Sequence, residues 1–245
     1  MIITKYSASG NTFVIFHTNI KDDYSSLAIE LCKKENVDGL IVVIPHEIYD
    51  FEWLFYNSDG STASMCGNGT RAVAHYAFTN KLASTNVKFL TGAGVITCVV
   101  DDDIVETTMP KPSVMKNEFE ELGYRWIIID TGVPHLVTLV DDLTQFNLDI
   151  CSKMRYKYNA NVNFAKVENG DLKVRTYERG VESETQACGT GMTACFLQAL
   201  ELNLISSPAN VYPTSGELLV LKKDKNGIYF KGKVIKIEEK KYNDF

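Results

Sequence analysis

The chain contains one cysteine-glycine motif twice, and this duplication limits its fold more than any other feature. Residues 65–82 read MCGNGTRAVAHYAFTNKL, and residues 187–204 read ACGTGMTACFLQALELNL. Cys66 and Cys188 therefore stand 122 residues apart, which is half of the 245-residue chain. A repeat at a fixed spacing indicates that one structural unit has been copied.

The segments that flank the two motifs keep the same order and nearly the same offset. Each cysteine follows an apolar strand pattern that ends in Tyr and breaks into a polar loop, WLFYNSDGSTAS in the first copy and VRTYERGVESETQ in the second. Upstream, SASGNTFVIF matches DTGVPHLVTL, and downstream NVKFLTGAGVITCVVDDD matches NVYPTSGELLVLKKDK. Four matches in one order predict a tandem duplication.

The expected secondary structure is mostly short strands around two long helices. Residues 67–80 and 189–203 are apolar on nearly every side, which predicts helices buried all round. Further helices are expected at 25–35 and 142–155. The fold class is therefore α+β: two pseudo-symmetric domains, each a curved, mostly antiparallel sheet or barrel wrapped around a central helix. Strands rich in Val, Ile, Phe and Tyr are predicted at 2–6, 13–18, 40–45, 51–56, 87–90, 95–100, 104–109, 125–130, 136–140, 161–167, 172–177, 218–221, 228–231 and 234–237.

The duplication also predicts where the chain divides. Residues 1–115 should form the N-terminal half and residues 116–235 the C-terminal half. Prolines and charges cluster in MPKPSVMKNEFEELG (109–123), and we expect the boundary between the halves to lie in this segment. Residues 236–245 are expected to return to the first half as a strand.

Composition excludes several classes of function. A net charge of −6 without any basic run argues against nucleic-acid binding. No apolar run reaches the ~18 residues of a membrane span, and the N-terminus lacks a signal-peptide pattern, so a cytoplasmic address is expected. Six cysteines without a CxxC pair predict reduced thiols and no metal site. Cys32, Cys98, Cys151 and Cys195 are expected to be packing residues.

Cys66 and Cys188 suggest chemistry because each stands at the start of a predicted helix. The first turn of a helix presents free N–H groups and a partial positive charge, which stabilise a thiolate. The glycines that follow leave those N–H groups open to a carboxylate. Two opposed thiols suit inversion of a stereocentre, since one removes a proton while the other delivers one to the opposite face. Such a reaction needs no cofactor, and the chain holds neither a G-x-G-x-x-G motif nor a P-loop.

At these residues the sequence resembles the diaminopimelate epimerase family. The matching blocks, in order, are SGNTFVIF, FYNSDGSTASMCGNGTRA, TGAGVI, GVPH, NANVNF and YERGVESETQACGTG, and they cover almost the whole chain. The resemblance implies a cofactor-independent two-base epimerase that interconverts LL- and meso-2,6-diaminopimelate, a small-molecule substrate, in lysine and cell-wall synthesis. It also implies a homodimer and a pair of pseudo-symmetric domains, in agreement with the repeat.

The same resemblance implies roles for individual residues. Cys66 and Cys188 would be the acid and base, and His135 and Glu178 would tune them. An Arg grips a carboxylate with two parallel hydrogen bonds, which suits the distal end of a diacid. The substrate-binding residues would be Asn11, Asn57, Gly67, Asn68, Asn161, Glu178, Arg179, Gly189 and Thr190.

Two positions depart from the family pattern. Val133 stands where Asn is common, and Thr12 follows Asn11 where Asp is common. Neither change touches the thiols, so the predicted reaction stands while substrate preference is less firmly determined. Three alternatives stay open from the residues themselves: a proline or hydroxyproline racemase of the same fold, a thiol redox protein, and a non-catalytic binding module.

Overall fold

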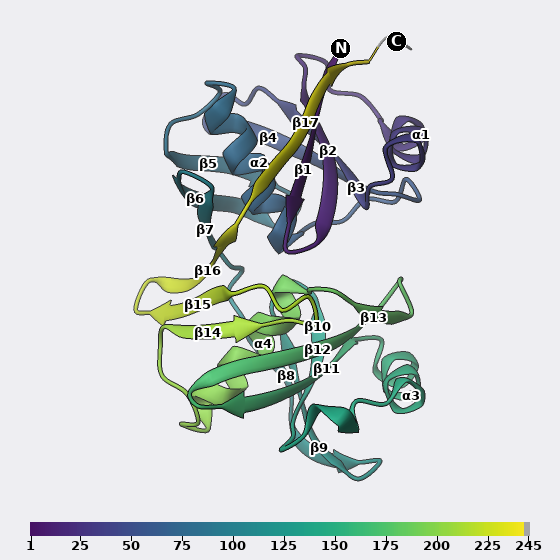
Figure 1. The fold of residues 1–245 in the computed structure, drawn as a ribbon, viewed down its shortest axis with the longest axis vertical. Coiled ribbons are helices and arrows are strands. Elements are labelled where there is room, and N and C mark those ends of the chain that lie inside the picture. Colours follow the sequence, from purple (N-terminus) through teal and green to yellow (C-terminus); the bar gives the residue numbers. More distant parts are fainter. Residues whose placement is uncertain (243–245) are drawn as a thin grey trace. The chain divides into compact units, whose positions relative to one another are not determined.

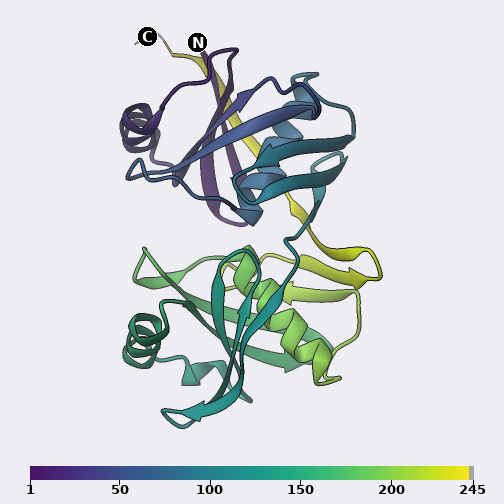
Figure 2. The same cartoon turned by 180° about the vertical axis from the view of Figure 1, so that it is seen from behind.

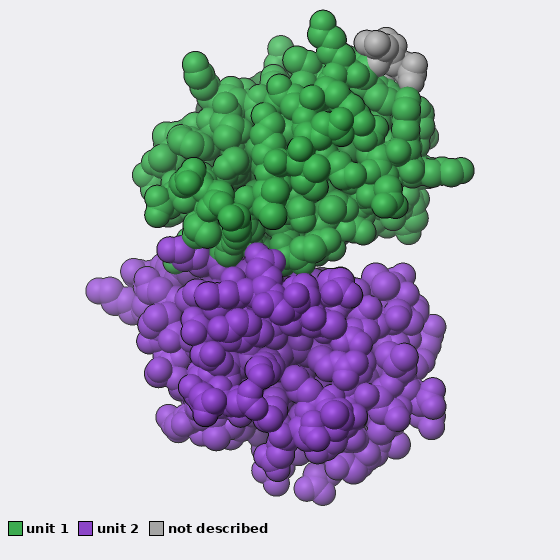
Figure 3. All heavy atoms as spheres, viewed as in Figure 1, with its two compact units in different colours: residues 1–108, 232–245 green, residues 109–231 purple. Residues whose placement is uncertain are grey.

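The computed structural model describes residues 1–242 of the chain. These residues form two compact units, shown in different colours in Figure 3. Unit 1 comprises residues 1–108 with the described part of 232–245, and unit 2 comprises residues 109–231. Each unit contains its own set of strands and its own pair of α-helices (Figures 1 and 2).

Unit 1 places helix α2 inside a curved sheet. The strand pairs run β17–β1–β2–β3–β4–β5–β6–β7, with β2–β3 and β4–β5 parallel and the other pairs antiparallel. Helix α1 connects β2 to β3, and α2 connects β4 to β5. The elements are β1 (Ile2–Ala8), β2 (Asn11–His17), α1 (Ser25–Glu35), β3 (Gly39–Ile44), β4 (Phe51–Asn57), α2 (Gly67–Thr79), β5 (Asn86–Thr91), β6 (Gly94–Asp101), β7 (Ile104–Thr108) and β17 (Ile235–Lys241).

Unit 2 repeats this connectivity around helix α4. The pairs β10–β11 and β12–β14 are parallel, α3 connects β10 to β11, and α4 lies between β12 and β14 in the chain. The elements are β8 (Ser113–Glu121), β9 (Tyr124–Asp130), β10 (Pro134–Leu139), the 3-10 helix η1 (Leu143–Gln145), α3 (Leu148–Tyr158), β11 (Asn161–Glu168), β12 (Asp171–Glu178), β13 (Ser183–Thr185), α4 (Gly189–Glu201), β14 (Ala209–Tyr212), β15 (Leu219–Asp224) and β16 (Gly227–Lys233).

The repeated connectivity and the sheet-wrapped helices confirm the predicted fold class. The helices become central because their sequences leave no polar face: ten of the thirteen residues of α2 are buried, and so are ten of the thirteen of α4. A helix without a polar face is stable only when other elements cover every side of it. The sheet of each unit provides that cover, and the N-terminus of the helix is thereby held in one place.

A second apolar layer in each unit lies under the shorter helix. In unit 1, Leu31 and Cys32 of α1 pack with Leu40 and Val42 of β3. In unit 2, the corresponding cluster lies under α3 and includes the fully buried Trp126. Its indole N–H donates to the Glu121 carbonyl at 2.9 Å, so its one polar atom is satisfied. These layers anchor the outer face of each sheet.

Most of the segment 109–123, in which the boundary between the halves is predicted, forms a strand. Residues Ser113–Glu121 form β8, which pairs with β9 through a turn at Leu122 and Gly123, both with positive φ. The side chains of β8 are largely exposed on both faces, so the strand has no apolar alternation to reveal it. Only its backbone pairing with β9 makes it a strand.

Other element predictions differ mainly at their ends. The helix expected at 142–155 is a short 3-10 turn followed by α3, because the Asn147 side chain accepts the N–H groups of Asp149 and Ile150 and starts a new helix there. The three-residue strand β13 was not predicted. The expected returning strand is β17, which pairs with β1; residues 243–245 lie outside the described part. The domain bounds 1–115 and 116–235 stay a prediction.

Candidate active site

Cys66 occupies the N-cap of α2, as the sequence predicts. Its backbone is extended, with φ −144° and ψ 105°, and its Sγ accepts the Gly69 N–H at 3.3 Å. The side chain is partly exposed, while Gly67 and Asn68 behind it are buried. The thiol therefore stands at the positive end of a buried helix dipole, where a negative charge is stabilised.

A buried polar cluster holds the first turn of α2. The Asn68 side chain donates to Asn11 Oδ1 at 2.6 Å and accepts from the Arg71 guanidinium at 2.7 Å. Arg71 is fully buried and also donates to Ser9 Oγ at 2.6 Å and to the Lys233 carbonyl at 3.1 Å. The structure thus brings Asn11 and Asn68 together, and it links both to a buried cation that sequence reasoning missed.

Asn57 ends β4 and lies in a turn of its own. Its side-chain amide donates to Ser61 Oγ at 3.0 Å, and its backbone N–H donates to the Ser61 carbonyl at 2.7 Å. Among the residues that the structure describes, no hydrogen bond joins it to Asn11 or Asn68. Its predicted role in binding substrate stays a prediction.

Cys188 occupies the N-cap of α4 with nearly the same backbone as Cys66, φ −124° and ψ 105°. Its side chain is buried, with 8% of the residue exposed, and its Sγ lies 3.5 Å from Thr190 Oγ1. Gly189 and Thr190 form the first turn of α4 and are buried. The second half of the chain thus repeats the placement of a thiol at the N-terminus of a central helix.

His135 is fully buried in β10, behind the first turn of α4. Its Nε2 lies 2.9 Å from Thr190 Oγ1, and its Nδ1 lies 3.1 Å from the Asn163 amide nitrogen. Burial, together with the nearby charge of Arg179, lowers the pKa of His135 to about 3. The imidazole is therefore neutral at any physiological pH.

The loop that leads to Cys188 is tied to the start of β11. Asn161 Oδ1 accepts the backbone N–H of Arg179 at 2.8 Å, and the Asn161 amide lies 3.4 Å from His135 Nε2. The Arg179 guanidinium donates to the Asn159 carbonyl at 3.1 Å. Glu178 is the last residue of β12, so both charged side chains sit where the strand ends. The structure thus brings Asn161, His135 and Thr190 together in unit 2.

The departures from the family pattern have local explanations. Thr12 donates both its N–H and its hydroxyl to Asp38 Oδ2, at 2.8 Å and 3.0 Å, so an acidic partner is supplied by residue 38 instead of residue 12. The Val133 carbonyl accepts the Thr131 N–H at 3.2 Å, a turn bond that any side chain at 133 permits. The Val133 side chain adds no polar contact.

The four remaining cysteines are buried. Burial raises the pKa of Cys32 to about 11 and those of Cys98 and Cys151 to about 12, and it raises the pKa of Cys195 further. Thiols of this kind stay protonated and serve as small apolar residues. All six cysteines are reduced thiols, and among the described residues no three His, Cys, Asp or Glu side chains gather as a metal site.

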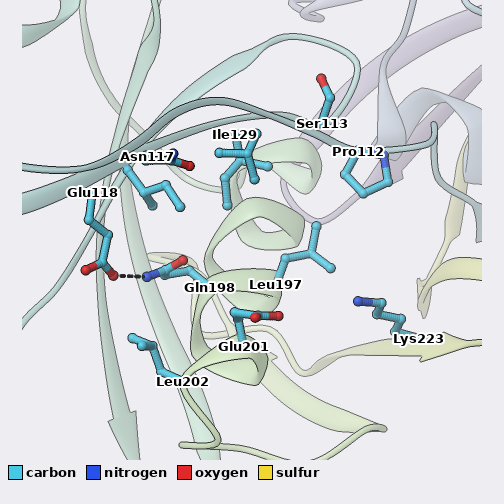
Figure 4. Close-up of a pocket in the computed structure, with 12 residues that line it drawn as sticks. Pro112, Ser113, Asn117, Glu118, Ile129, Leu197, Gln198, Glu201, Leu202 and Lys223 are labelled. Atoms are coloured by element: carbon cyan, nitrogen blue, oxygen red, sulfur yellow. Dashed lines mark hydrogen bonds between the residues drawn. The ribbon is translucent and has the colours of Figure 1, made fainter.

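A cavity of about 640 Å³ opens in unit 2 but lies away from the thiol (Figure 4). β8 and β9 form one wall and the last turns of α4 form another, with the Gln198 amide donating to Glu118 at 2.8 Å. Leu197 is eight residues along the helix from Gly189, or about 12 Å. This cavity is therefore not the site of the cysteine chemistry.

Sequence reasoning missed Asn163 as well as Arg71. Asn163 is fully buried in β11, two residues after Asn161, so the two side chains point to the same face of the sheet. The motif NANVNF contained this signal, because a polar residue at every second position of a buried strand is unusual. Arg71 gave no signal, since an Arg on a helix is ordinarily exposed.

Comparison with known proteins agrees with the duplicated site. The family model for diaminopimelate epimerase matches residues 3–115 and 127–237, one stretch in each half. Proteins named diaminopimelate epimerase from Nitratiruptor sp. and Campylobacter jejuni are 53% and 51% identical to the chain over 243 residues. These alignments cover 98% of this chain and 97% and 98% of those relatives. One from Helicobacter pylori is 40% identical over 255 residues, covering 96% and 93%.

Solved structures share the fold at low sequence identity. A PhzC/PhzF-type phenazine biosynthesis protein from Clostridium difficile has a TM-score of 0.77 at 13% identity, with 99% of each chain covered. A probable proline racemase from Agrobacterium radiobacter has a TM-score of 0.76 at 11% identity, covering 100% of this chain and 93% of that one. Proteins of several families thus share the fold, whereas the sequence matches identify a single family. The chain belongs to the diaminopimelate epimerase family and is an isomerase.

Proposed function

We propose that the chain interconverts LL- and meso-2,6-diaminopimelate by a two-base mechanism, with Cys66 and Cys188 acting on opposite faces of one α-carbon. The observation that carries this proposal is that both units place a cysteine at the N-cap of their central helix, followed by Gly-x-Gly. The names of the relatives support diaminopimelate as the substrate.

In the reaction, the thiolate of one cysteine takes the α-proton, and the electrons of the broken C–H bond spread into the substrate carboxylate. The thiol of the other cysteine delivers its proton to the opposite face, which inverts the carbon and leaves the negative charge on the second sulfur. The first-turn N–H groups of α2 and α4, at Gly67, Asn68, Gly189 and Thr190, would stabilise the charge on the carboxylate. This chemistry uses no cofactor.

The remaining predicted residues would hold the substrate. Asn11, Asn57 and Asn161 offer amide groups, and Arg179 offers a planar guanidinium that suits the distal carboxylate of a diacid. Glu178 would accept a hydrogen bond from a substrate ammonium group. His135 is neutral, so it would act near Cys188 as a hydrogen-bonding group and not as a cation.

Solvent exchange in heavy water tests the proposal. Incubation with LL-diaminopimelate should place one deuterium at the inverted α-carbon and produce the meso form, as mass spectrometry and chiral chromatography would show. Cys66→Ser and Cys188→Ser should each reduce turnover by at least about a thousandfold. Full turnover in either variant would contradict the two-base mechanism, and it would leave a thiol redox role open.

A proline racemase is the second candidate, because a structure of that description shares the fold. L-Proline incubated in heavy water under the same conditions distinguishes the two activities. Deuterium that entered proline and not diaminopimelate would overturn the substrate assignment while leaving the thiol chemistry in place.

We also propose a homodimer in the cytoplasm. Six reduced cysteines fit a reducing compartment, and the resemblance to the family supports the dimer. No helix of the described residues is long and apolar enough to span a membrane. Light scattering after size-exclusion chromatography should give a mass of about twice the 27.4 kDa of one chain; a mass of one chain would contradict the dimer.

A further inference from the structure

Three neighbouring strand positions behind Cys188 carry polar side chains, whereas the corresponding three positions of unit 1 carry apolar ones. In unit 2, His135, Asn163 and Thr176 lie on three neighbouring strands and are at most 3% exposed. The strand registers of unit 1 place an apolar side chain at each corresponding position. Those side chains, all buried, are Phe13, Ile41 and Phe55. Since apolar groups fill this place in the same fold, the costly burial of polar groups calls for a functional reason.

The Asn163 side chain has only one orientation that satisfies its neighbours. The Thr176 hydroxyl donates to Asn163 Oδ1 at 2.9 Å. Asn163 Nδ2 donates to the Leu136 carbonyl at 2.8 Å, and a carbonyl can only accept. The same NH₂ group faces His135 Nδ1 at 3.1 Å, so it is the donor of that hydrogen bond as well.

This orientation determines the tautomer of His135. Nδ1 accepts from Asn163 and carries no hydrogen, so the single proton of the neutral ring sits on Nε2. Nε2–H donates to Thr190 Oγ1 at 2.9 Å, and the Asn161 amide, 3.4 Å from Nε2, donates instead to the Pro134 carbonyl at 3.4 Å. The hydroxyl of Thr190 therefore has its own proton available, and Cys188 Sγ lies 3.5 Å from it. From Thr176 through Asn163 and His135 to Thr190, each side chain donates to the next one toward the sulfur.

A glycine in the first turn of α4 allows these hydrogen-bonded side chains to approach the helix. A Cβ on Gly191 would lie 2.4 Å from Asn163 Oδ1 and 3.3 Å from the His135 ring, so glycine is needed for the contact. The corresponding Gly69 faces Trp53 and the Cys66 side chain instead, at 3.3 Å. The two thiols thus stand at similar helix ends with different groups behind them.

We infer that Asn163 is a positioning residue for the proposed reaction: it holds His135 as the Nε2–H tautomer, which turns the Thr190 hydroxyl to donate a hydrogen bond to the Cys188 thiolate. The inference rests on the proposed function for its catalytic meaning, although the hydrogen-bond chain itself does not depend on the substrate. A hydrogen bond to a charged sulfur favours the thiolate by about tenfold or more.

Few ionisable groups surround this interior. The charge of Arg179, at the end of β12 beside Glu178, reaches His135. Cys195 lies about two turns further along α4, and burial, together with the charge of Cys188, raises its pKa. On β9, the Asp130 carboxylate accepts the Gly132 N–H at 2.8 Å. The ring of His135 itself stays neutral, because burial lowers its pKa to about 3.

Nuclear magnetic resonance of the ¹⁵N-labelled full-length protein tests the tautomer directly. The chain has four histidines, and His135→Gln assigns the signal of interest. We expect the Nε2–H form from pH 6 to 9 in the unmodified protein. In Asn163→Asp the carboxylate accepts from Nδ1–H, so the ring should change to the Nδ1–H form. An Nδ1–H ring or an imidazolium in the unmodified protein would overturn the inference.

Alkylation by iodoacetamide measures the effect on the sulfur. In a Cys66→Ser background, the pH midpoint of Cys188 alkylation, read from the peptide mass spectrum, should rise by about one pH unit in Asn163→Asp and in Thr190→Val. Thr190→Ser keeps a hydroxyl and should restore the midpoint. At high pH, where the thiol is fully ionised, the alkylation rate reaches a plateau. The height of that plateau measures how accessible the sulfur is, independently of its pKa. An unchanged midpoint in Thr190→Val would refute the inference even if Asn163→Asp failed to fold.

Thr193→Val is the matched control. Thr193 is a fully buried threonine of the same helix. Its hydroxyl donates to the Gly189 carbonyl at 2.8 Å and not to any group of the hydrogen-bond chain through His135. It should keep the alkylation midpoint, and a shift equal to that of Thr190→Val would contradict the inference. With Cys66 intact, Asn163→Asp and Thr190→Val should lower kcat at least about tenfold with KM within about twofold. If the unmodified protein did not turn over diaminopimelate, the proposed function would be refuted, but the hydrogen-bond chain from Asn163 to Cys188 would not.

Discussion

Single residues determine how closely other groups approach the two helix N-termini. Gly191 leaves room for Asn163 and His135 behind Cys188, and Gly69 leaves room for Trp53 behind Cys66. Arg71 connects the first turn of α2 to Ser9 and to the Lys233 carbonyl. These contacts are fixed by the absence of a Cβ or by one buried charge, so substitutions there should have effects that their neighbours do not.

Gly191→Ala should be more damaging than Gly69→Ala. An added Cβ at 191 would meet Asn163 Oδ1 at 2.4 Å, whereas at 69 its nearest contacts lie at 3.3 Å. We expect Gly191→Ala to lower the free energy of unfolding by about 1–3 kcal/mol and exchange activity by at least about tenfold. Urea denaturation and the heavy-water assay measure both. Equal losses in the two variants would show that the close approach of Asn163 is unimportant.

Arg71→Met should destabilise the protein strongly. The change leaves Asn68 Oδ1, Ser9 Oγ and the Lys233 carbonyl without the buried cation that donates to them. Unsatisfied buried acceptors cost about 1–3 kcal/mol each, so we expect a loss of about 3 kcal/mol or more in urea denaturation. Arg125→Met is the control, because its ion pair is exposed and 3.9 Å long. A loss of unfolding free energy within 1 kcal/mol of that in the control would show that Arg71 does not hold the first turn of α2 in place.

At the scale of elements, the loop before Cys188 is braced by ion pairs to neighbouring strands and helices. Arg175 of β12 pairs with Glu184 of β13 through two hydrogen bonds, at 2.8 Å and 2.7 Å. Arg155 of α3 pairs with Glu182 in the turn that follows Glu178, at 2.7 Å. The short strand β13 therefore owes its position to side chains as much as to its ladder with β12.

Glu184→Gln should reduce stability in a pH-dependent way. Hydrogen bonds from Arg175 hold the pKa of Glu184 below its usual range, so the pair stabilises the folded state above about pH 4.5 and less as pH falls through the lowered value. Because solvent reaches the pair, we expect a loss of about 1 kcal/mol at pH 7 that shrinks below pH 4. Urea denaturation at both pH values measures it. Glu47→Gln, in an exposed loop, is the control, and a loss independent of pH would contradict the ionic explanation.

At the scale of the whole molecule, the two thiols come from different compact units. Unit 1 carries Cys66 and unit 2 carries Cys188, and the chain passes between the units twice, after residue 108 and after residue 231. Neither unit holds both bases, so the proposed reaction requires that both act on one substrate molecule. The duplication supplies two similarly placed thiols, and the groups around them differ.

Oxidation should inactivate the enzyme reversibly if the two thiols act on one carbon. Mild oxidant should join Cys66 to Cys188, because opposed thiols that share a substrate carbon are close enough for a disulfide after small movements. We expect a cross-linked peptide pair in the mass spectrum and recovery of activity with dithiothreitol. Bound substrate should slow the inactivation. Equal turnover in oxidised and reduced protein would contradict this arrangement.

The amino-acid sequence by itself determined the duplication, the fold class, the two buried helices and the two cysteines at their starts. These features could be predicted because they depend on local patterns: apolar residues all round a helix, glycines after a cysteine, and one spacing repeated. The strand β8 could not be predicted, because its residues are exposed on both faces and only its pairing with β9 defines it.

The tertiary structure alone decided what stands behind each thiol. Asn163 becomes a partner of His135 because β10 and β11 run parallel in one register, with Val137 opposite Asn163. Arg71 is buried because the strand that follows Lys233 returns to unit 1 and pairs with β1. Such contacts join residues 28 and 162 positions apart. Local periodicity carries no information about them, because the fold of the backbone brings them together.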